Sequence, residues 1–165
     1  MPGVPGGRKP GSYEWYEIQD NIAYWKEFEF KKVIVPAISG SVNIAVDTKG
    51  YFSNNKTSIF VCADAAFVSG VLNSGVALWF ARQVFATKQG GFLDFETRYS
   101  SQWPVPVMTP EKQKPVERLV ERILSAKQRD ADADVSALEW EIDELVYGLY
   151  GLTREEIKIV EGQTK

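Results

Sequence analysis

Two short motifs in this chain have the spacing of a metal-dependent nuclease site, Glu29-Phe-Lys31 and Glu156-Ile-Lys158. In such a site the carboxylate holds the ion and the lysine steadies the attacking water. Asp20 is the only further ligand near the first motif, and the second lies in a segment predicted to be helical. Because Glu-x-Lys triplets arise by chance in most chains, we expect no metal ligands here. Magnesium-dependent DNA cleavage that is lost in Glu29→Ala would revive this alternative.

Other catalytic chemistry is constrained by composition. The 165 residues include no histidine, which removes Ser-His-Asp and Cys-His hydrolysis and histidine metal sites. The one cysteine, Cys62, stands in an apolar run and is predicted to be a small buried hydrophobe. The turn Lys88-Gln-Gly-Gly91 lacks the spacing of a phosphate-binding loop, and the Asn/Asp-Pro-Pro-aromatic tetrad of amino-methyltransferases is absent from the sequence. We therefore expect no catalytic residues in this chain.

The polar residues of the predicted loops are of types that can bind nucleic acid. Lys and Arg can neutralise phosphates, while Asn, Gln and Arg can pair with base edges in the major groove. Composition alone favours an ordinary solvated surface, so further information is needed to decide. The residues of this kind are Lys49, Asn54, Asn55, Lys56, Arg82, Gln83, Lys88, Gln89, Arg98, Tyr99, Ser100 and Gln102.

Charge is distributed unevenly along the chain. The net charge is −3, but residues 31–107 carry seven basic and four acidic side chains, whereas residues 108–165 carry nine basic and thirteen acidic ones. An anion-binding surface is therefore expected in the first part. The sequence has neither a run of eighteen apolar residues nor the pattern of a signal peptide, which predicts a cytoplasmic protein without a membrane partner.

The first part has the pattern of an α+β domain. Strands are predicted at residues 32–36, 43–46, 57–61 and 92–95, with turn-forming residues between them. Apolar residues at helical spacing predict one helix over 67–85, and residues 103–106 are expected to be extended because they include two prolines. The prediction is a small antiparallel or mixed sheet with one packed helix.

The second part is predicted to be a helical hairpin. Apolar residues between 116 and 124 recur at helical spacing, with Pro115 expected in the first turn. After the break at 130–134, a second helix carries an apolar seam, with Gly151 as its cap; Thr153 and Glu156 form a capping box for a last short helix. The seam is expected either to cover the α+β domain or to dock a second polypeptide. Its residues are Val135, Leu138, Ile142, Leu145 and Leu149.

These patterns divide the sequence into three predicted regions. Residues 1–12 are rich in glycine and proline and are predicted to be a disordered linker or leader. Residues 13–107 form the predicted α+β domain, which opens with a dense group of aromatic residues, and residues 108–165 form the helical tail.

The order of several short segments resembles the TaqI-like specificity domain, the target-recognition region that follows the adenine-N6 methyltransferase in type IIG and related restriction-modification enzymes. The resemblance extends over about residues 13–161. Two positions depart from the family, where Ala37 follows Pro36 in place of glutamate and Gln89 precedes the paired glycines in place of arginine. The segments are residues 15–20, 24–25, 28–39, 50–56, 71–74, 79–80, 89–92, 103–106, 142–147 and 149–156.

The resemblance implies a DNA sequence-recognition module that lacks its own catalytic domain. Its partners would be double-stranded DNA and a methyltransferase domain in the same or another chain, and that domain would bind S-adenosylmethionine, with Mg²⁺ if the enzyme also cleaves. Lys49, Lys56, Lys88 and Arg98 are the expected phosphate contacts. Base contacts or close approach are expected from Asn54, Asn55, Gln89, Gly90 and Gly91, the glycines because they permit positive φ.

An alternative is a half-sized specificity subunit. In that case the helical tail would pair with a second copy or dock a separate methyltransferase chain. Loss of a stable dimer in Leu145→Asp, measured by sedimentation, would favour it.

Overall fold

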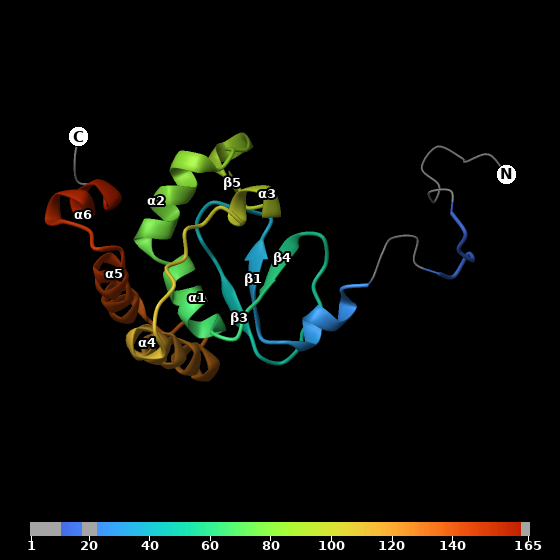
Figure 1. Cartoon of the computed structure of the whole chain (residues 1–165), viewed down its shortest axis with the longest axis horizontal. Helices are drawn as coiled ribbons and strands as arrows, with labels where there is room; N and C mark the ends of the chain where they lie inside the picture. Colours follow the sequence, from blue (N-terminus) through green and yellow to red (C-terminus); the bar gives the residue numbers. More distant parts are fainter. Residues whose placement is uncertain (1–10, 18–22, 163–165) are drawn as a thin grey trace.

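The computed structural model describes residues 11–17 and 23–162 and shows an α+β fold (Figure 1). Small antiparallel sheets and the helices packed on them form the first part, and three further helices form the second. The α+β class and the helical C-terminal region predicted from the sequence are confirmed. The predicted leader at 1–12 and the nuclease ligand Asp20 fall wholly or largely outside the described residues.

The larger sheet has the strand order β3-β1-β4, with both neighbours antiparallel to β1. Strands β1 (Lys32–Pro36) and β4 (Thr57–Val61) have the predicted bounds, whereas β3 (Ala45–Asp47) begins two residues later than predicted. The β-branched side chains Val33 and Val35 alternate with their neighbours and are fully buried in the core. A 3₁₀ helix, η1 (Trp25–Glu29), precedes β1.

A second, two-stranded sheet joins β2 (Ile38–Ser39) to β5 (Leu93–Asp94). The other side of β5 pairs with the segment that precedes it, through a bridge between Thr87 and Leu93. The 3₁₀ helix η2 (Gln89–Gly91) forms the loop of this hairpin, and the short helix α3 (Thr97–Ser100) follows β5. The sequence did not predict β2 or α3, because both are too short to show a period.

The single helix predicted over 67–85 is wrong. The structure has two helices, α1 (Ala65–Leu72) and α2 (Gly75–Val84), which are bent by 64° at Asn73-Ser74. Ser74 causes the break because its hydroxyl accepts a hydrogen bond from the Ala77 amide and so starts a new helix. In the described part of the chain, no single helix has the length and composition of a membrane span, although this bent pair does when both helices are counted together.

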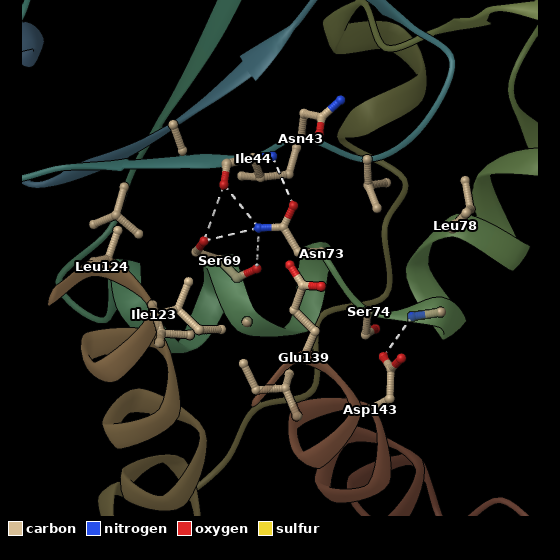
Figure 2. Close-up of a pocket in the computed structure, with 17 residues that line it drawn as sticks. Asn43, Ile44, Ser69, Asn73, Ser74, Leu78, Ile123, Leu124, Glu139 and Asp143 are labelled. Carbon is tan, nitrogen blue, oxygen red and sulfur yellow. Dashed lines mark hydrogen bonds between the residues drawn. The ribbon is translucent and has the colours of Figure 1, made fainter. Parts of the chain in front are cut away.

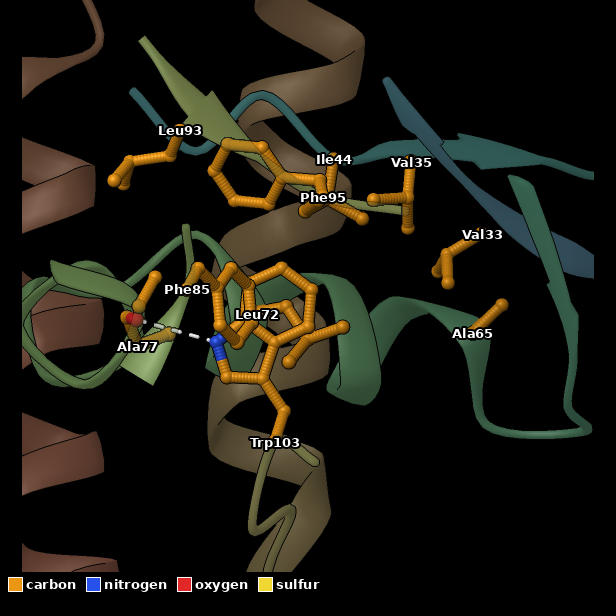
Figure 3. Close-up of a cluster of buried hydrophobic side chains, with 11 residues drawn as sticks. Val33, Val35, Ile44, Ala65, Leu72, Ala77, Phe85, Leu93, Phe95 and Trp103 are labelled. Atoms are coloured by element: carbon orange, nitrogen blue, oxygen red, sulfur yellow. Dashed lines mark hydrogen bonds between the residues drawn. The ribbon is translucent and has the colours of Figure 1, made fainter. Parts of the chain in front are cut away.

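The core beneath the sheets combines aliphatic side chains with the aromatic side chains of Phe85, Phe95 and Trp103 (Figure 3). Phe95 is fully buried and packs against Phe85 and Trp103, with ring centroids 5.6 Å away in each case. The Trp103 indole N–H donates to the Ala77 carbonyl of α2 over 3.2 Å, which satisfies its polar atom inside the core. The extended segment at 103–106 therefore fastens α2 to the sheets.

The tail consists of α4 (Pro110–Arg129), α5 (Ser136–Tyr150) and α6 (Arg154–Val160). Pro115 lies inside α4 and not in its first turn as predicted, because Pro110 occupies that position. Gly151 caps α5 at φ 68°, and the capping box between Thr153 and Glu156 is present, so both predictions are confirmed.

The apolar seam of α5 faces the chain's own core. Ile142 is buried in a second hydrophobic cluster built from α1, α2, α4 and α5, and Leu138 and Leu149 pack against that cluster. Leu145 is the exposed member of the seam. The sequence left two roles open for this seam, covering the α+β domain or docking a second polypeptide. For most of these side chains the structure shows the first role.

Asn73, at the break between α1 and α2, ties the helices to the strand segment before β3 (Figure 2). Its side chain accepts from the Ile44 amide and donates to the Ile44 carbonyl, both over 2.9 Å. Ser69 donates to the same carbonyl over 3.3 Å. This network forms one wall of a cavity of about 650 Å³ bounded on the opposite side by α4 and α5.

We expect Asn73→Ala to lower the free energy of unfolding by about 1–3 kcal/mol, because it leaves the Ile44 amide without its side-chain acceptor and the Ile44 carbonyl with Ser69 as its one remaining side-chain donor. Urea denaturation measures the change, with Asn55→Ala on an exposed turn as the control. Equal stability of the two variants would show that water satisfies Ile44 as well as Asn73 does.

Candidate nucleic-acid interface

A buried carboxylate, Asp94, gathers two of the predicted phosphate contacts. Its side chain is fully buried and lies 3.0 Å from the Lys88 ammonium and 3.1 Å from the Arg98 guanidinium. Lys88 lies between the Thr87 bridge and η2, Asp94 lies in β5 and Arg98 in α3, so three segments meet at this point. The Lys88 and Arg98 side chains remain 41% and 61% exposed, respectively, and therefore keep donors available to solvent or to an anion.

The protonation of Asp94 is set by its partners. Burial alone would raise the pKa of this carboxyl, but hydrogen bonds from the Glu96 amide, Lys88 and Arg98 together lower it below the ordinary value of 3.8. Because the folded-state pKa is lowered, the ionised form stabilises the fold above pH 3.8, and this contribution is lost as the pH falls through the lowered value.

We expect the stability of the wild-type chain to fall more steeply between about pH 4 and pH 2 than that of Asp94→Asn, which has no such proton to bind. Urea midpoints measured across this range test the prediction. Parallel pH profiles for the two proteins would contradict it.

The strand pairing puts these groups on the outer face of a small ribbon, defined by residues 38–40 and 86–94. Ile38 is paired with Asp94, and Leu93 with Ser39, in antiparallel register. Because paired residues share a face and successive residues alternate, Ile38, Phe92 and Asp94 lie on the face opposite Leu93. Ile38 and Phe92 are exposed there, whereas the Asp94 side chain is buried. Leu93 points the other way and is buried in the core (Figure 3). We call this outer surface the ribbon face.

The loop at the tip of the ribbon is tightly closed. The Lys88 amide donates to the Phe92 carbonyl over 2.7 Å, and the Gly91 amide donates to the Lys88 carbonyl over 3.2 Å. Gly90 and Gly91 have φ of 82° and 80°, so the predicted positive φ of both residues is confirmed. A Cβ on Gly91 would meet no atom within 4 Å, which leaves its backbone open to approach from outside. Gln89 is exposed in the same loop.

The turn formed by Asn54, Asn55 and Lys56 lies near the same end of the sheets. The Ala37 amide donates to the Lys56 carbonyl over 2.8 Å, and Ala37 in turn accepts from the Phe95 amide over 2.8 Å. One residue into β4, the Ser58 and Thr97 hydroxyls lie 3.2 Å apart, which links this strand to the start of α3. All three turn residues are exposed. The structure therefore brings eight of the nine predicted site residues to one end of the sheets.

Lys49 is the exception. It follows β3 at the opposite end of β1, where its amide donates to Asp47 over 2.8 Å. Two further polar residues of the loops are also removed from the surface: Ser100 is buried, and the ring of Tyr99 packs against Phe85 with centroids 5.8 Å apart.

A buried ion pair near Lys49 was not predicted from the sequence. The Lys32 ammonium lies 2.6 Å from Asp47, with both side chains almost fully buried, and it also donates to the Phe28 carbonyl over 2.5 Å. Asp47 accepts from the Lys49 and Tyr51 amides, both over 2.8 Å. The one sequence signal was Asp47 three residues before Gly50, the spacing of a turn; nothing indicated that Lys32 points inward.

The catalytic alternatives gain no support from the described residues. Within 11–17 and 23–162, no group of three or more acidic, cysteine or histidine side chains is arranged to hold a metal ion. Glu156 is engaged in the capping box of α6. Cys62 is half-buried and not fully buried as predicted, and burial raises the pKa of its thiol, which disfavours the reactive thiolate.

Exposed cations and amide side chains, the types that contact phosphates and base edges, thus share one end of the α+β domain with a tight glycine loop. Comparison with known families agrees: the model of the TaqI-like C-terminal specificity domain matches residues 8–105, and the chain belongs to this family. It is a DNA-recognition module of restriction-modification enzymes, which implies DNA binding and association with a methyltransferase part. The match ends before α4, and no curated protein matches the chain.

Proposed function

We propose that this chain reads the target sequence for an adenine-N6 DNA methyltransferase by placing the ribbon face in the major groove. The observation that carries the proposal is the pair of exposed cations, Lys88 and Arg98, that buried Asp94 holds at the ribbon face. A carboxylate that fixes both side chains reduces the conformational entropy lost when they bind phosphate.

The shape of the ribbon supports this mode of docking. The major groove of B-DNA admits a two-stranded β-ribbon, and residues 86–94 form such a hairpin. Lys88 and Arg98 would bind phosphates and fix the register, with Lys56 as a third contact from the neighbouring turn. Asn54, Asn55 and Gln89 would then reach base edges. The open backbone of Gly91, beside Gly90 in the tight loop, would allow a close approach.

The methyl transfer itself would take place in the associated methyltransferase part. That part would bind S-adenosylmethionine and receive the target adenine after its rotation out of the duplex. The role of this chain is to hold the neighbouring base pairs in register. We propose no catalytic group in the described residues.

Selection from random-sequence duplexes tests the proposal. The full chain is expected to enrich duplexes that share a short sequence containing adenine, and Gln89→Ala is expected to relax the preference at one position. Gln113→Ala on α4, away from the ribbon, serves as the control. Binding without any shared sequence would contradict a role in target recognition.

A further inference from the structure

Two large apolar side chains on the ribbon face, Phe92 and Ile38, are exposed to solvent. Phe92 and Ile38 are 47% and 54% exposed, although they belong to paired strands whose other faces supply the core. Both lie on the same side of the ribbon as Asp94 and its two cations. The ribbon face thus has an apolar centre beside the groups that bind phosphate.

The ring of Phe92 lies close to two glycines, Gly40 just after β2 and Gly90 in the hairpin loop. Cβ atoms built on Gly40 and Gly90 would lie 3.7 Å and 3.4 Å from this ring. The Phe92 carbonyl is fixed by the Lys88 amide. An exposed side chain whose backbone is fixed in a closed hairpin is suited to contact with a ligand, since less conformational freedom is lost on binding than from an open loop.

The chemistry of the major groove offers one apolar group to such a side chain. Each thymine presents its 5-methyl group there, and phenylalanine is among the residues that contact it. The other base edges present hydrogen-bonding atoms, which an apolar surface would leave unpaired.

We infer that Phe92, assisted by Ile38, recognises thymine through its 5-methyl group. This inference rests on the proposed docking of the ribbon face in the major groove, and it assigns to these two residues a specificity that neither charge nor hydrogen bonding provides.

The test uses the duplex selected by the full chain and a second copy in which uracil replaces each thymine, so that only methyl groups are removed. We expect the uracil duplex to bind about fourfold more weakly for each methyl group contacted, the factor that burial of one such group provides. In Phe92→Ala and in Ile38→Ala, thymine and uracil duplexes should bind with closer affinities than in the wild type.

Phe30→Ala is the matched control, because Phe30 is also an exposed phenylalanine but adjoins the opposite end of β1. It should retain the full difference between the duplexes. Equal affinity of the wild-type chain for the thymine and uracil duplexes, or a thymine preference that survives in Phe92→Ala, would overturn the inference. Failure of the wild-type chain to bind any duplex would instead contradict the proposed function.

Discussion

Asp47→Ala is expected to lower the free energy of unfolding by about 3–5 kcal/mol, the cost of leaving one member of a buried ion pair without its partner. The Lys32 ammonium would then be buried with only the Phe28 carbonyl and the Phe28 ring, 5.8 Å away, to interact with it. The turn after β3 would also lose the acceptor of the Lys49 and Tyr51 amides. The predicted result is a much lower urea midpoint.

Two further variants separate these causes. Asp132→Ala removes an exposed carboxylate between α4 and α5 and should change stability little. Lys32→Met combined with Asp47→Asn leaves no buried charge and keeps one oxygen for the turn amides, so it should recover a large part of the loss. If Asp47→Ala were as stable as Asp132→Ala, the buried ion pair would not support the fold as described.

The same ion pair contributes to acid sensitivity. Burial alone would raise the pKa of Asp47, but hydrogen bonds from Lys32 and from the Lys49 and Tyr51 amides lower it below 3.8. Its stabilising contribution is therefore present above pH 3.8 and is lost as the pH falls through the lowered value, in the same direction as that of Asp94.

Lys88→Gln combined with Arg98→Gln is expected to weaken duplex binding at least about a hundredfold, because two charge-assisted contacts to phosphate are lost. The slope of log affinity against log salt should become shallower by about 2, since each neutralised phosphate contributes about 0.9. Fluorescence anisotropy with a labelled duplex measures both quantities.

The controls address folding and charge. Adding Asp94→Asn to this double variant removes the buried charge that would otherwise be left without its cations, and binding should remain weak while the urea midpoint stays close to that of the wild type. Lys112→Gln with Lys114→Gln makes the same change in net charge on α4 and should leave affinity within about threefold. Equal losses in the two double variants would indicate a nonspecific effect of net charge.

Local pattern was sufficient for most of the fold. The bounds of β1 and β4 follow from β-branched runs that end at proline or turn residues, and the capping box of α6 follows from the spacing of Thr153 and Glu156. The period of apolar residues continues across Asn73 and Ser74 and therefore predicts one helix, although Ser74 is of a type that starts helices. Asn73 is further tied to Ile44, a partner far away in sequence.

The candidate site was harder to predict from the sequence than the fold, because tertiary contacts bring its residues together. The basic and amide residues could be chosen by type, and Gly90 and Gly91 by their conformation. Which of them share a surface could not be predicted, because Asp94, the residue that joins Lys88 to Arg98, reads in the sequence as an ordinary polar position of a short strand. By residue type Lys49 is equivalent to Lys56 and Lys88, and only its position at the opposite end of β1 separates it from them.

The most direct test of DNA contact by the ribbon face is to measure how the affinity of the full chain for a labelled random-sequence duplex depends on salt. We expect the affinity to fall steeply as salt rises, with a slope of log affinity against log salt of about −3 or steeper. The reason is that Lys56, Lys88 and Arg98 would neutralise at least three phosphates. No binding at low salt, or binding that does not change with salt, would contradict the assignment of the ribbon face as the DNA contact.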